Sequence, residues 1–229
     1  MAIKKEKIVI SLGGSLIVPD KVDVPFLKEF KQFILRHTRT KQFYIITGGG
    51  KVAREYAAAA GEIGNISHED RDWLGIHCTR LNAHLLRTIF RKHAFPRIIK
   101  NPFEKIKTNK QIIMAAGYKP GCSSDLDAVI IAKTIGAKTV LNLTNIDYVY
   151  DKDPRKYKDA KPLKQVSWKK FRSIIPKTWR YGMNAPFDPV ASREAQKLGL
   201  KVIIINGKKL KEIDNFLRNK EFIGTTIEG

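Results

Sequence analysis

The chain of 229 residues is long enough for one domain with a substantial core, and its content of 43% hydrophobic and 28% charged residues is that of an ordinary soluble protein. Its apolar runs are far shorter than the roughly 20 residues that a membrane helix needs, and no signal-type apolar segment precedes the first glycines, so we expect a cytoplasmic protein. The 43 Lys and Arg against 22 Asp and Glu give a net charge of +21, which favours anionic ligands.

Strands and helices are predicted to alternate along the chain. Short apolar runs predict strands at residues 8–12, 43–47, 111–117, 138–144 and 201–206. Helical spacing and helix-forming composition predict helices at residues 24–37, 51–63, 72–93, 125–136, 188–199 and 208–219. Asp23 is expected to cap the first helix, and the polar stretch 145–162 is assigned no element. This order predicts an α/β fold, a three-layer αβα sandwich with a mainly parallel central sheet, as one domain over residues 1–229.

Glycine-rich turns follow the predicted strands. Parallel sheets bind ligands beyond the carboxyl ends of their strands, which here read SLGGS, TGGGK, AAGYKPGCSSD and LTNID. Glycine lets the backbone approach a phosphate, and the helix that follows offers unpaired N–H groups. The segment GGGKVA has dinucleotide-type spacing but lacks an acid at the end of the next strand, and no Walker-type phosphate loop can be written. Any one turn could be purely structural, but four at successive strand ends favour an anion site.

The loop GYKPGCSSDLDAV combines cationic, hydroxyl and carboxylate groups. Ser123, Ser124 or Asp125 could simply cap the next helix, and Asp188 before Pro189 could cap another. The same groups also suit phosphoryl transfer, which needs donors to the moving charge and a carboxylate to hold Mg²⁺ or align the attacking oxygen. Both interpretations stay open on these residues alone.

Five segments, taken in chain order, resemble the amino acid kinase superfamily, and most closely its archaeal-type UMP kinase branch: IVISLGGSLI, IITGGGKVAREY, PGCSSDLDAV, LTNIDYVYDKDP and NAPFDPVA. The resemblance covers nearly the whole chain. It implies an acceptor-binding lobe over roughly residues 1–116 and a nucleotide-binding lobe over roughly 117–229. It also implies direct in-line phosphoryl transfer from ATP to UMP, a requirement for Mg²⁺, and a homo-oligomer that is commonly a hexamer in this family.

The resemblance also assigns roles to residues by position. On the ATP side it implies Ser11, Gly13, Gly14, Ser15, Gly50, Arg54, Thr144, Asn145, Tyr150 and Asp153. On the UMP side it implies Gly49, Asp72, Pro120, Gly121, Cys122, Ser123 and Ser124, with Thr79 and Asn82 following Asp72 at helical spacing. The residues expected to act in catalysis are Arg54, Lys51, Asp125 and Asp188, with Lys119 as a further source of positive charge. The metal ligands are left open.

The chain departs from the superfamily pattern at three places. Ser11 stands where many members carry Lys, a substitution that the archaeal-type branch shares, and Tyr148 replaces a common Gly. Residues 122–124 read Cys-Ser-Ser where UMP kinases usually have an aromatic residue or His followed by two Thr. The acceptor therefore stays open between UMP and another phosphate or carboxylate, such as isopentenyl phosphate, carbamate or an amino acid. A non-catalytic nucleotide-binding or storage protein is the other alternative. We expect no membrane and no nucleic-acid partner, because only the net charge favours RNA.

Overall fold

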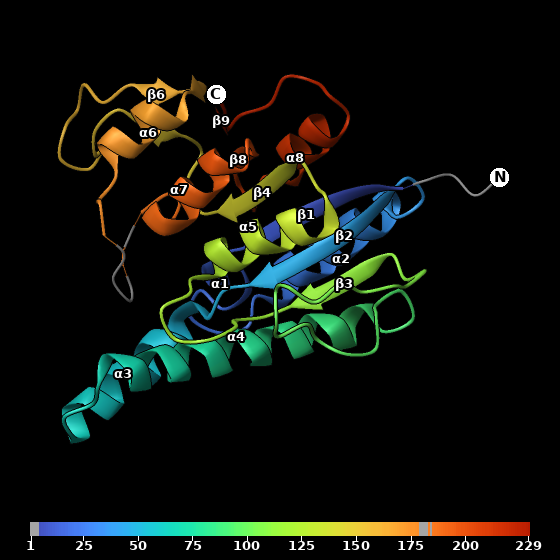
Figure 1. The fold of residues 1–229 in the computed structure, drawn as a ribbon, viewed down its shortest axis with the longest axis horizontal. Coiled ribbons are helices and arrows are strands. Elements are labelled where there is room, and N and C mark those ends of the chain that lie inside the picture. Colours follow the sequence, from blue (N-terminus) through green and yellow to red (C-terminus); the bar gives the residue numbers. More distant parts are fainter. Residues whose placement is uncertain (1–4, 179–182, 184) are drawn as a thin grey trace.

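The computed structural model describes residues 5–178, 183 and 185–229. At its centre lies a seven-stranded sheet with the order β3-β2-β1-β4-β8-β9-β7 (Figure 1). Neighbouring strands run parallel except β8 and β9, which are antiparallel. The strands of this sheet are β1 (Glu6–Leu12), β2 (Lys41–Thr47), β3 (Ile112–Ala115), β4 (Thr139–Thr144), β7 (Gln165–Val166), β8 (Lys201–Asn206) and β9 (Thr225–Ile227). The mainly parallel sheet predicted from the sequence is thus confirmed.

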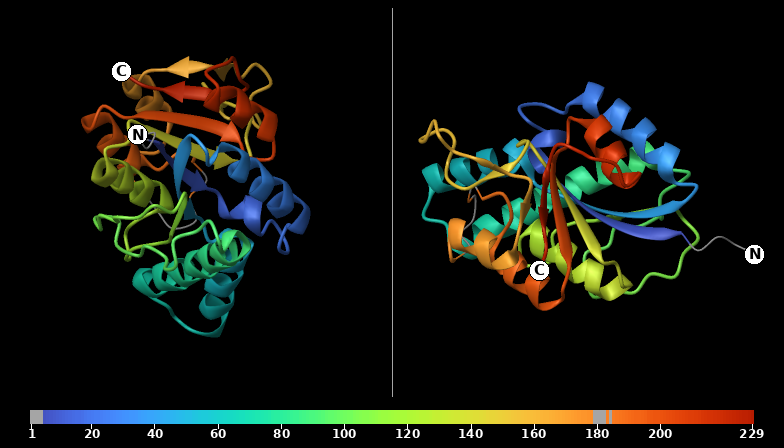
Figure 2. Two further views of the ribbon diagram at one scale, coloured as in Figure 1. Left: turned by 90° about the vertical axis from the view of Figure 1, so that its right-hand side faces the viewer. Right: turned by 90° about the horizontal axis from the view of Figure 1, so that it is seen from above.

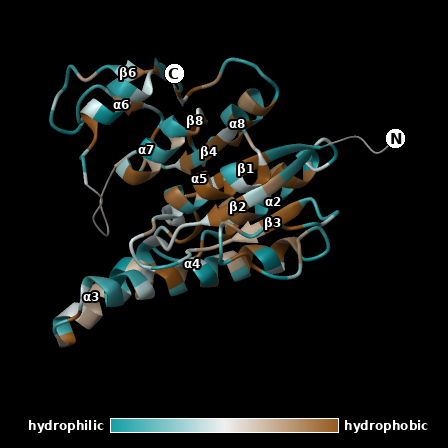
Figure 3. Cartoon of the chain, viewed as in Figure 1, coloured by the Kyte–Doolittle hydropathy of each residue, from teal (hydrophilic) through white to brown (hydrophobic). Residues whose placement is uncertain are grey.

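Helices cover both faces of the sheet (Figure 2). One face packs against α1 (Gly14–Ile17), α2 (Val24–His37), α4 (His68–Phe90) and α8 (Leu210–Leu217). The other packs against α5 (Ser124–Ile135), α6 (Trp168–Ile174) and α7 (Pro189–Lys197). Alternate residues of β1 enter the two cores, with Ile8 and Ile10 in one and Val9 in the other, as the two-residue period of a strand requires. The predicted three-layer sandwich is confirmed, and Figure 3 shows its apolar strands inside the polar outer surface.

The remaining helix, α3 (Gly50–Ile63), packs against α4, and the two project together from one side of the molecule (Figure 1). Helix α4 begins at His68, so the predicted start at Asp72 was wrong. Ser67 and Asp70 form a reciprocal capping box, in which each side chain bonds the other's backbone N–H at 3.0 and 3.1 Å. Asp72 therefore lies in the second turn of α4. The predicted cap of α2 is confirmed, because Asp23 Oδ1 accepts the Phe26 N–H at 3.0 Å.

The polar stretch 145–162, to which no element was assigned, contributes to a small hairpin. Its strands are β5 (Val149–Tyr150) and β6 (Pro162–Leu163). Such two-residue strands, like β7 and the three-residue β9, are too short to show a periodicity in the sequence. Among the described residues, no helix is both long and apolar enough to cross a membrane.

The strand order reverses its direction of growth at β1. Strands β2 and β3 add to one side of β1, and β4 and β8 add to the other. In such sheets a crevice opens beyond the carboxyl ends of the strands on either side of the reversal. Here those ends are Leu12 of β1, Thr47 of β2 and Thr144 of β4, and two of the glycine-rich turns follow them directly.

Candidate functional site

Two cavities lie at this edge of the sheet. The first has a volume of about 350 Å³ and is lined by Gly14, Ser15, Gly49, Gly50, Ala53, Arg54, Asp72, Gly75, Ile76, Thr79, Gly117, Cys122, Ser123, Ser124 and Met183. The second has a volume of about 430 Å³ and is lined by Thr144, Asn145, Ile146, Tyr148, Val149, Tyr150, Lys152, Asp153, Pro154, Arg155, Ile174, Ile175, Pro176, Ala185 and Pro186. Each cavity therefore contains one group of the residues singled out from the sequence.

The floor of the first cavity is formed by two glycine turns in direct backbone contact. A Cβ atom added to Gly14 would lie 2.0 Å from the backbone N of Gly50 and 2.7 Å from the carbonyl carbon of Gly48. Gly50 itself has a φ of 73°, a conformation that favours glycine. The turn after β1 is also tied to β4, because the Gly13 N–H donates to the Leu143 carbonyl at 2.9 Å. The approach of the two turns thus depends on glycine at both.

Helix α4 fixes the loops on both sides of this cavity. Asp72 Oδ2 accepts the Gly121 N–H at 2.7 Å, and the Thr79 hydroxyl accepts the Gly117 N–H at 2.8 Å. The side-chain amide of Asn82 donates to the Gly48 carbonyl at 2.8 Å. We call residues 117–124, which contain the predicted Pro120–Ser124 segment, the acceptor loop. Asp72 and residues 117 and 122–124 of this loop line the first cavity, whereas Pro120 and Gly121, also predicted on the UMP side, do not.

Three polar residues from β1, α5 and the start of α7 form a cluster, and none of them lines either cavity, including the predicted catalytic residues Asp125 and Asp188. The Ser11 hydroxyl donates to Asp125 Oδ1 at 2.9 Å, and the Asp188 N–H donates to Asp125 Oδ2 at 3.1 Å. Asp188 in turn caps α7 by accepting the Ala191 N–H at 2.6 Å. Ser11 is only 2% exposed and lines neither cavity, so the structure does not place it with the predicted ATP contacts. Its partner is instead the carboxylate of Asp125.

Burial governs the ionisation of this cluster. Desolvation raises the pKa of Asp125 to about 6, although the bonds from Ser11 and Asp188 favour the charged form. Desolvation also raises the pKa of Asp188, against the N–H groups that bond it at the start of α7. The site thus holds two carboxylates whose charge is costly to the fold, as is common where function requires the charge.

We expect Asp125→Asn to stabilise the protein at pH 8. In the folded protein the pKa of Asp125 lies above its ordinary value of 3.8. Below pH 3.8 the carboxyl group is protonated in both the folded and the unfolded protein, so it does not change the free energy of unfolding there. The cost grows as pH rises through 3.8 to 6 and is then constant, at about 1–3 kcal/mol for this partly desolvated group. In this variant the amide oxygen can accept the Asp188 N–H, and the amide NH₂ group can donate to the Ser11 hydroxyl oxygen, so both partners are kept without the charge. Thermal unfolding at pH 4 and pH 8 measures the difference.

Asp23→Asn is the matched control for this comparison. The Phe26 N–H lowers the pKa of Asp23, so its charge adds stability above pH 3.8 that is lost as pH falls. Asp23→Asn should therefore have no stabilising effect at pH 8. The difference in melting temperature between Asp125→Asn and wild type should be larger at pH 8 than at pH 4. An equal difference at the two pH values would contradict the destabilising effect proposed for the Asp125 charge.

The predicted cations divide between the cavity and the surrounding surface. Arg54 lines the first cavity. Lys51 does not, because its ammonium group pairs with Asp20 and also lies 3.5 Å from Glu55. Lys119 lies over the ring of Tyr118, 5.4 Å from its centroid, and lines neither cavity. Among the described residues, Arg54 is therefore the only one of these three cations positioned to meet a ligand in the first cavity.

The second cavity contains four further residues of the predicted ATP side, namely Thr144, Asn145, Tyr150 and Asp153, whereas Gly13 lines neither cavity. Tyr148, noted above as a departure from the family pattern, lines the same cavity. The carboxylate of Asp153 is bonded by the guanidinium of Arg155 through two contacts of 3.0 Å, which lower the Asp153 pKa. The aromatic and acidic side chains at this position suit the base and ribose of a nucleotide.

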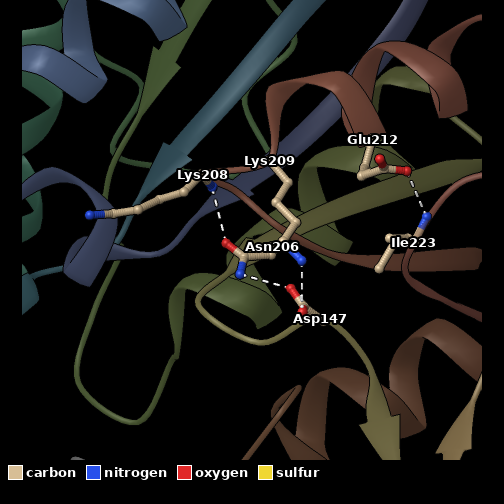
Figure 4. Close-up of polar contacts among 6 residues, drawn as sticks. All are labelled: Asp147, Asn206, Lys208, Lys209, Glu212 and Ile223. Carbon is tan, nitrogen blue, oxygen red and sulfur yellow. Dashed lines mark hydrogen bonds and ion pairs between the residues drawn. The ribbon is translucent and has the colours of Figure 1, made fainter.

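Sequence reasoning missed the contacts that hold the loop beside this cavity. Asp147 accepts hydrogen bonds from the Asn206 side-chain amide at 2.9 Å and from the Lys209 ammonium group at 2.8 Å, as Figure 4 shows. Asn206 also accepts the backbone N–H of Lys208 at 3.1 Å. These bonds fix residues 145–148 to the carboxyl end of β8. The sequence does contain an acid in LTNID and two lysines in NGKK, which could have indicated this contact. That the two segments meet depends on the pairing of β4 with β8, which the sequence does not show.

Cation ligation by the protein is limited in the part of the chain that the structure describes. It contains no group of three or more His, Cys, Asp or Glu side chains that could hold a metal ion. Asn184, the first residue of the NAPFDPVA segment, lies outside the described residues.

Comparison with known proteins agrees with this geometry. The model of the amino acid kinase family matches residues 6–206. The uridylate kinase of Pyrococcus abyssi is 34% identical over 225 residues, covering 97% of this chain and 99% of that protein. The uridylate kinase of Thermoplasma volcanium is 33% identical over 226 residues, covering 97% and 98%. The crystal structure of uridylate kinase from Archaeoglobus fulgidus superposes with a TM-score of 0.84 at 29% identity, covering 96% of this chain and 99% of that chain. The chain therefore belongs to the amino acid kinase family, among relatives that are archaeal uridylate kinases.

Proposed function

We propose that this protein phosphorylates UMP to UDP with ATP, a step of pyrimidine nucleotide biosynthesis. One observation carries the proposal: the first cavity gathers Gly49, Arg54, Asp72 and the acceptor loop around the glycine turn assigned to ATP phosphates. The relatives named uridylate kinase, which match over nearly their full length, support the same substrate pair. The second cavity receives the adenosine part of ATP, beside Tyr150 and Asp153.

The reaction is a direct in-line transfer without a covalent enzyme intermediate. An oxygen of the UMP phosphate attacks the γ-phosphorus of ATP, and ADP leaves on the opposite side. The protein contributes mainly by holding both phosphates in line and by stabilising their charge. Backbone N–H groups at the start of α3 and the guanidinium of Arg54 supply positive charge at the first cavity. Asp125 holds the start of α7 by accepting the Asp188 N–H, and Asp188 caps that helix.

Mg²⁺ is proposed as the second cofactor. Such ions are commonly held by one or two carboxylates together with the phosphates of the substrate. Asp188 lines neither cavity, but its Oδ2 is buried without a hydrogen-bond partner among the described residues, so it is the carboxylate that would hold the ion, which would neutralise phosphate charge.

Assembly and location follow from the same family relationship. We propose a homo-oligomer, a hexamer as is common in the family, that acts in the cytoplasm. Exposed apolar side chains on the projecting pair α3 and α4 support self-association, notably Tyr56, Ile63 and Leu81, which are 60%, 89% and 66% exposed. The division into an acceptor-binding lobe, roughly residues 1–116, and a nucleotide-binding lobe, roughly 117–229, is part of this proposal. The acceptor loop is then the segment of the second lobe that closes the first cavity.

A panel of acceptors tests the proposed function. Purified protein with Mg²⁺ and ATP should release ADP fastest with UMP, and the product should be UDP. Other nucleoside monophosphates, isopentenyl phosphate, glutamate and carbamate serve as comparisons. A preference for any of these would reassign the acceptor, and binding of ATP and UMP without turnover would indicate a storage or sensing protein instead.

A further inference from the structure

The two residues that begin the acceptor loop have all four of their backbone polar groups bonded to side chains. The Gly117 N–H donates to the Thr79 hydroxyl at 2.8 Å, and the Tyr118 N–H donates to Asp127 Oδ2 at 3.1 Å. The guanidinium of Arg80 donates to both carbonyls, at 3.4 Å for Gly117 and 3.2 Å for Tyr118. Residues that leave a strand usually bond water or backbone, so this complete pairing with side chains marks a fixed point.

Two ionisable side chains hold the two ends of one peptide group. The carbonyl of Gly117 and the N–H of Tyr118 belong to the same peptide, and they meet the guanidinium of Arg80 and the carboxylate of Asp127 respectively. Arg80 comes from α4, and Asp127 comes from the first turn of α5. The Arg80 guanidinium is a charged donor, and hydrogen bonds to charged partners are about twice as strong as neutral ones. Burial raises the pKa of Asp127 to about 7, although the bond from the Tyr118 N–H favours its charged form, so this carboxyl group is partly ionised at neutral pH. The peptide is therefore held from two helices at once.

Stability alone does not account for these two charged side chains. Asp127 is 1% exposed, and its Oδ1 has no hydrogen-bond partner among the described residues. The Nε atom of Arg80 is likewise buried without a partner there, and its guanidinium also lies over the ring of Trp73, 5.8 Å from the centroid. Buried polar atoms without partners cost stability. The arrangement favours a role in which the position of the loop matters.

The anchored peptide controls how the acceptor loop enters the first cavity. Gly117 lines that cavity, and the loop then runs to Gly121, which Asp72 holds, and to Cys122, Ser123 and Ser124 in the cavity wall. The loop is thus fixed at its base by Arg80 and Asp127 and near its tip by Asp72. We infer that Arg80 and Asp127 are positioning residues that hold the acceptor loop in its ligand-binding conformation before the acceptor arrives. This inference rests on the proposed function in taking that acceptor to be UMP.

Pre-positioning of the acceptor loop should strengthen the binding of the acceptor and should not change the binding of ATP. Ordering a loop on binding reduces affinity, so loss of the anchor should weaken UMP without a new contact to UMP being lost. Loss of a hydrogen bond to a charged partner changes an equilibrium constant, here that of acceptor binding, by about 10- to 100-fold. Asp127→Ala and Arg80→Ala should therefore each raise the KM for UMP by about that factor, with kcat and the KM for ATP near their wild-type values. Such a split is the signature of lost binding that is uniform along the reaction.

The test combines steady-state kinetics with hydrogen exchange of the ligand-free protein. The Tyr118 and Gly121 amides should exchange faster in Asp127→Ala than in wild type, and Asp127→Asn, which keeps an acceptor oxygen, should restore part of the protection. Asp214→Ala and Arg172→Ala are matched controls, because Asp214 pairs with His37 and Arg218, and Arg172 bonds Gln196, all on other parts of the fold. Neither control should change the KM for UMP or the exchange of these amides.

The outcomes separate this inference from the proposed function. Exchange needs no turnover, so an unchanged Tyr118 amide in both alanine variants would overturn the anchor whether or not the protein makes UDP. KM values for UMP and ATP that rise together, in step with a lower melting temperature, would also overturn it, because they would indicate a general structural role. If wild-type protein makes no UDP while the alanine variants lose protection, the anchor stands and the proposed acceptor fails.

Discussion

Arg54→Ala should lower turnover about 10²- to 10³-fold while leaving the fold intact. Arg54 is exposed on α3, and it is the only Lys or Arg among the described residues that line the first cavity. Its guanidinium can stabilise charge on the phosphate being transferred, which backbone N–H groups alone cannot neutralise. Loss of one such preorganised donor typically costs about 3–4 kcal/mol in the transition state. Release of ADP at saturating UMP and ATP measures the effect.

Lys51→Ala is the control for this prediction, because Lys51 lies one helical turn earlier on α3 and pairs with Asp20 and Glu55. Its removal breaks exposed ion pairs, which contribute little to stability, and should leave turnover within about twofold. Arg54→Lys should recover only part of the rate, since a lysine cannot bond two phosphate oxygens as a guanidinium does. Equal losses in Lys51→Ala and Arg54→Ala would show that the charge is supplied differently.

Gly14→Ala should be the most destabilising single substitution of the site. The new methyl group would lie 2.0 Å from the backbone N of Gly50 and 2.6 Å from its Cα, and no side-chain rotation can relieve a clash with backbone. The turns after β1 and β2 would have to separate. We expect a loss of at least about 3 kcal/mol, and with it a loss of nucleotide binding. Thermal unfolding and calorimetric titration with ATP measure both.

Gly64→Ala provides the comparison for that substitution. Gly64 ends α3, no atom lies within 4 Å of the Cβ position there, and its φ of −160° is open to any residue. Its substitution should change stability by less than about 0.5 kcal/mol. Gly14→Ala with wild-type melting and wild-type ATP affinity would contradict the backbone contact between the two turns.

The long elements of this fold could be predicted from the sequence because each carries its own periodicity. The five predicted strands and six predicted helices all occur, with ends that shift by a few residues. The short elements could not be predicted, because β7 and β9 exist only through pairing with each other and with β8. The start of α4 was predictable in principle, since Ser67 and Asp70 have capping-box spacing, but the search for apolar residues placed it at Asp72.

The candidate site was predictable where a motif fixes the backbone and less so where a side chain chooses its partner. Residues of both glycine turns, Asp72 and residues 122–124 line one cavity, although Gly13, Pro120 and Gly121 do not. Lys51 and Arg54 are three residues apart and share one side of a helix, but Asp20 draws the lysine away. Ser11 and Asp125 are 114 residues apart, and nothing local to either indicates their bond. Such pairings are decided by the tertiary fold.

The two cavities have no lining residue in common within the described parts of the chain. The first draws on residues 14–124 and Met183, and the second on residues 144–186. A substitution of a residue that lines one cavity therefore replaces no lining side chain of the other cavity. In evolutionary terms, a lineage could exchange its acceptor through residues 117–124 and α4 while it kept the same nucleotide donor. Such divergence would begin at the Cys-Ser-Ser sequence of residues 122–124 on the acceptor side, as it would at Tyr148 on the donor side.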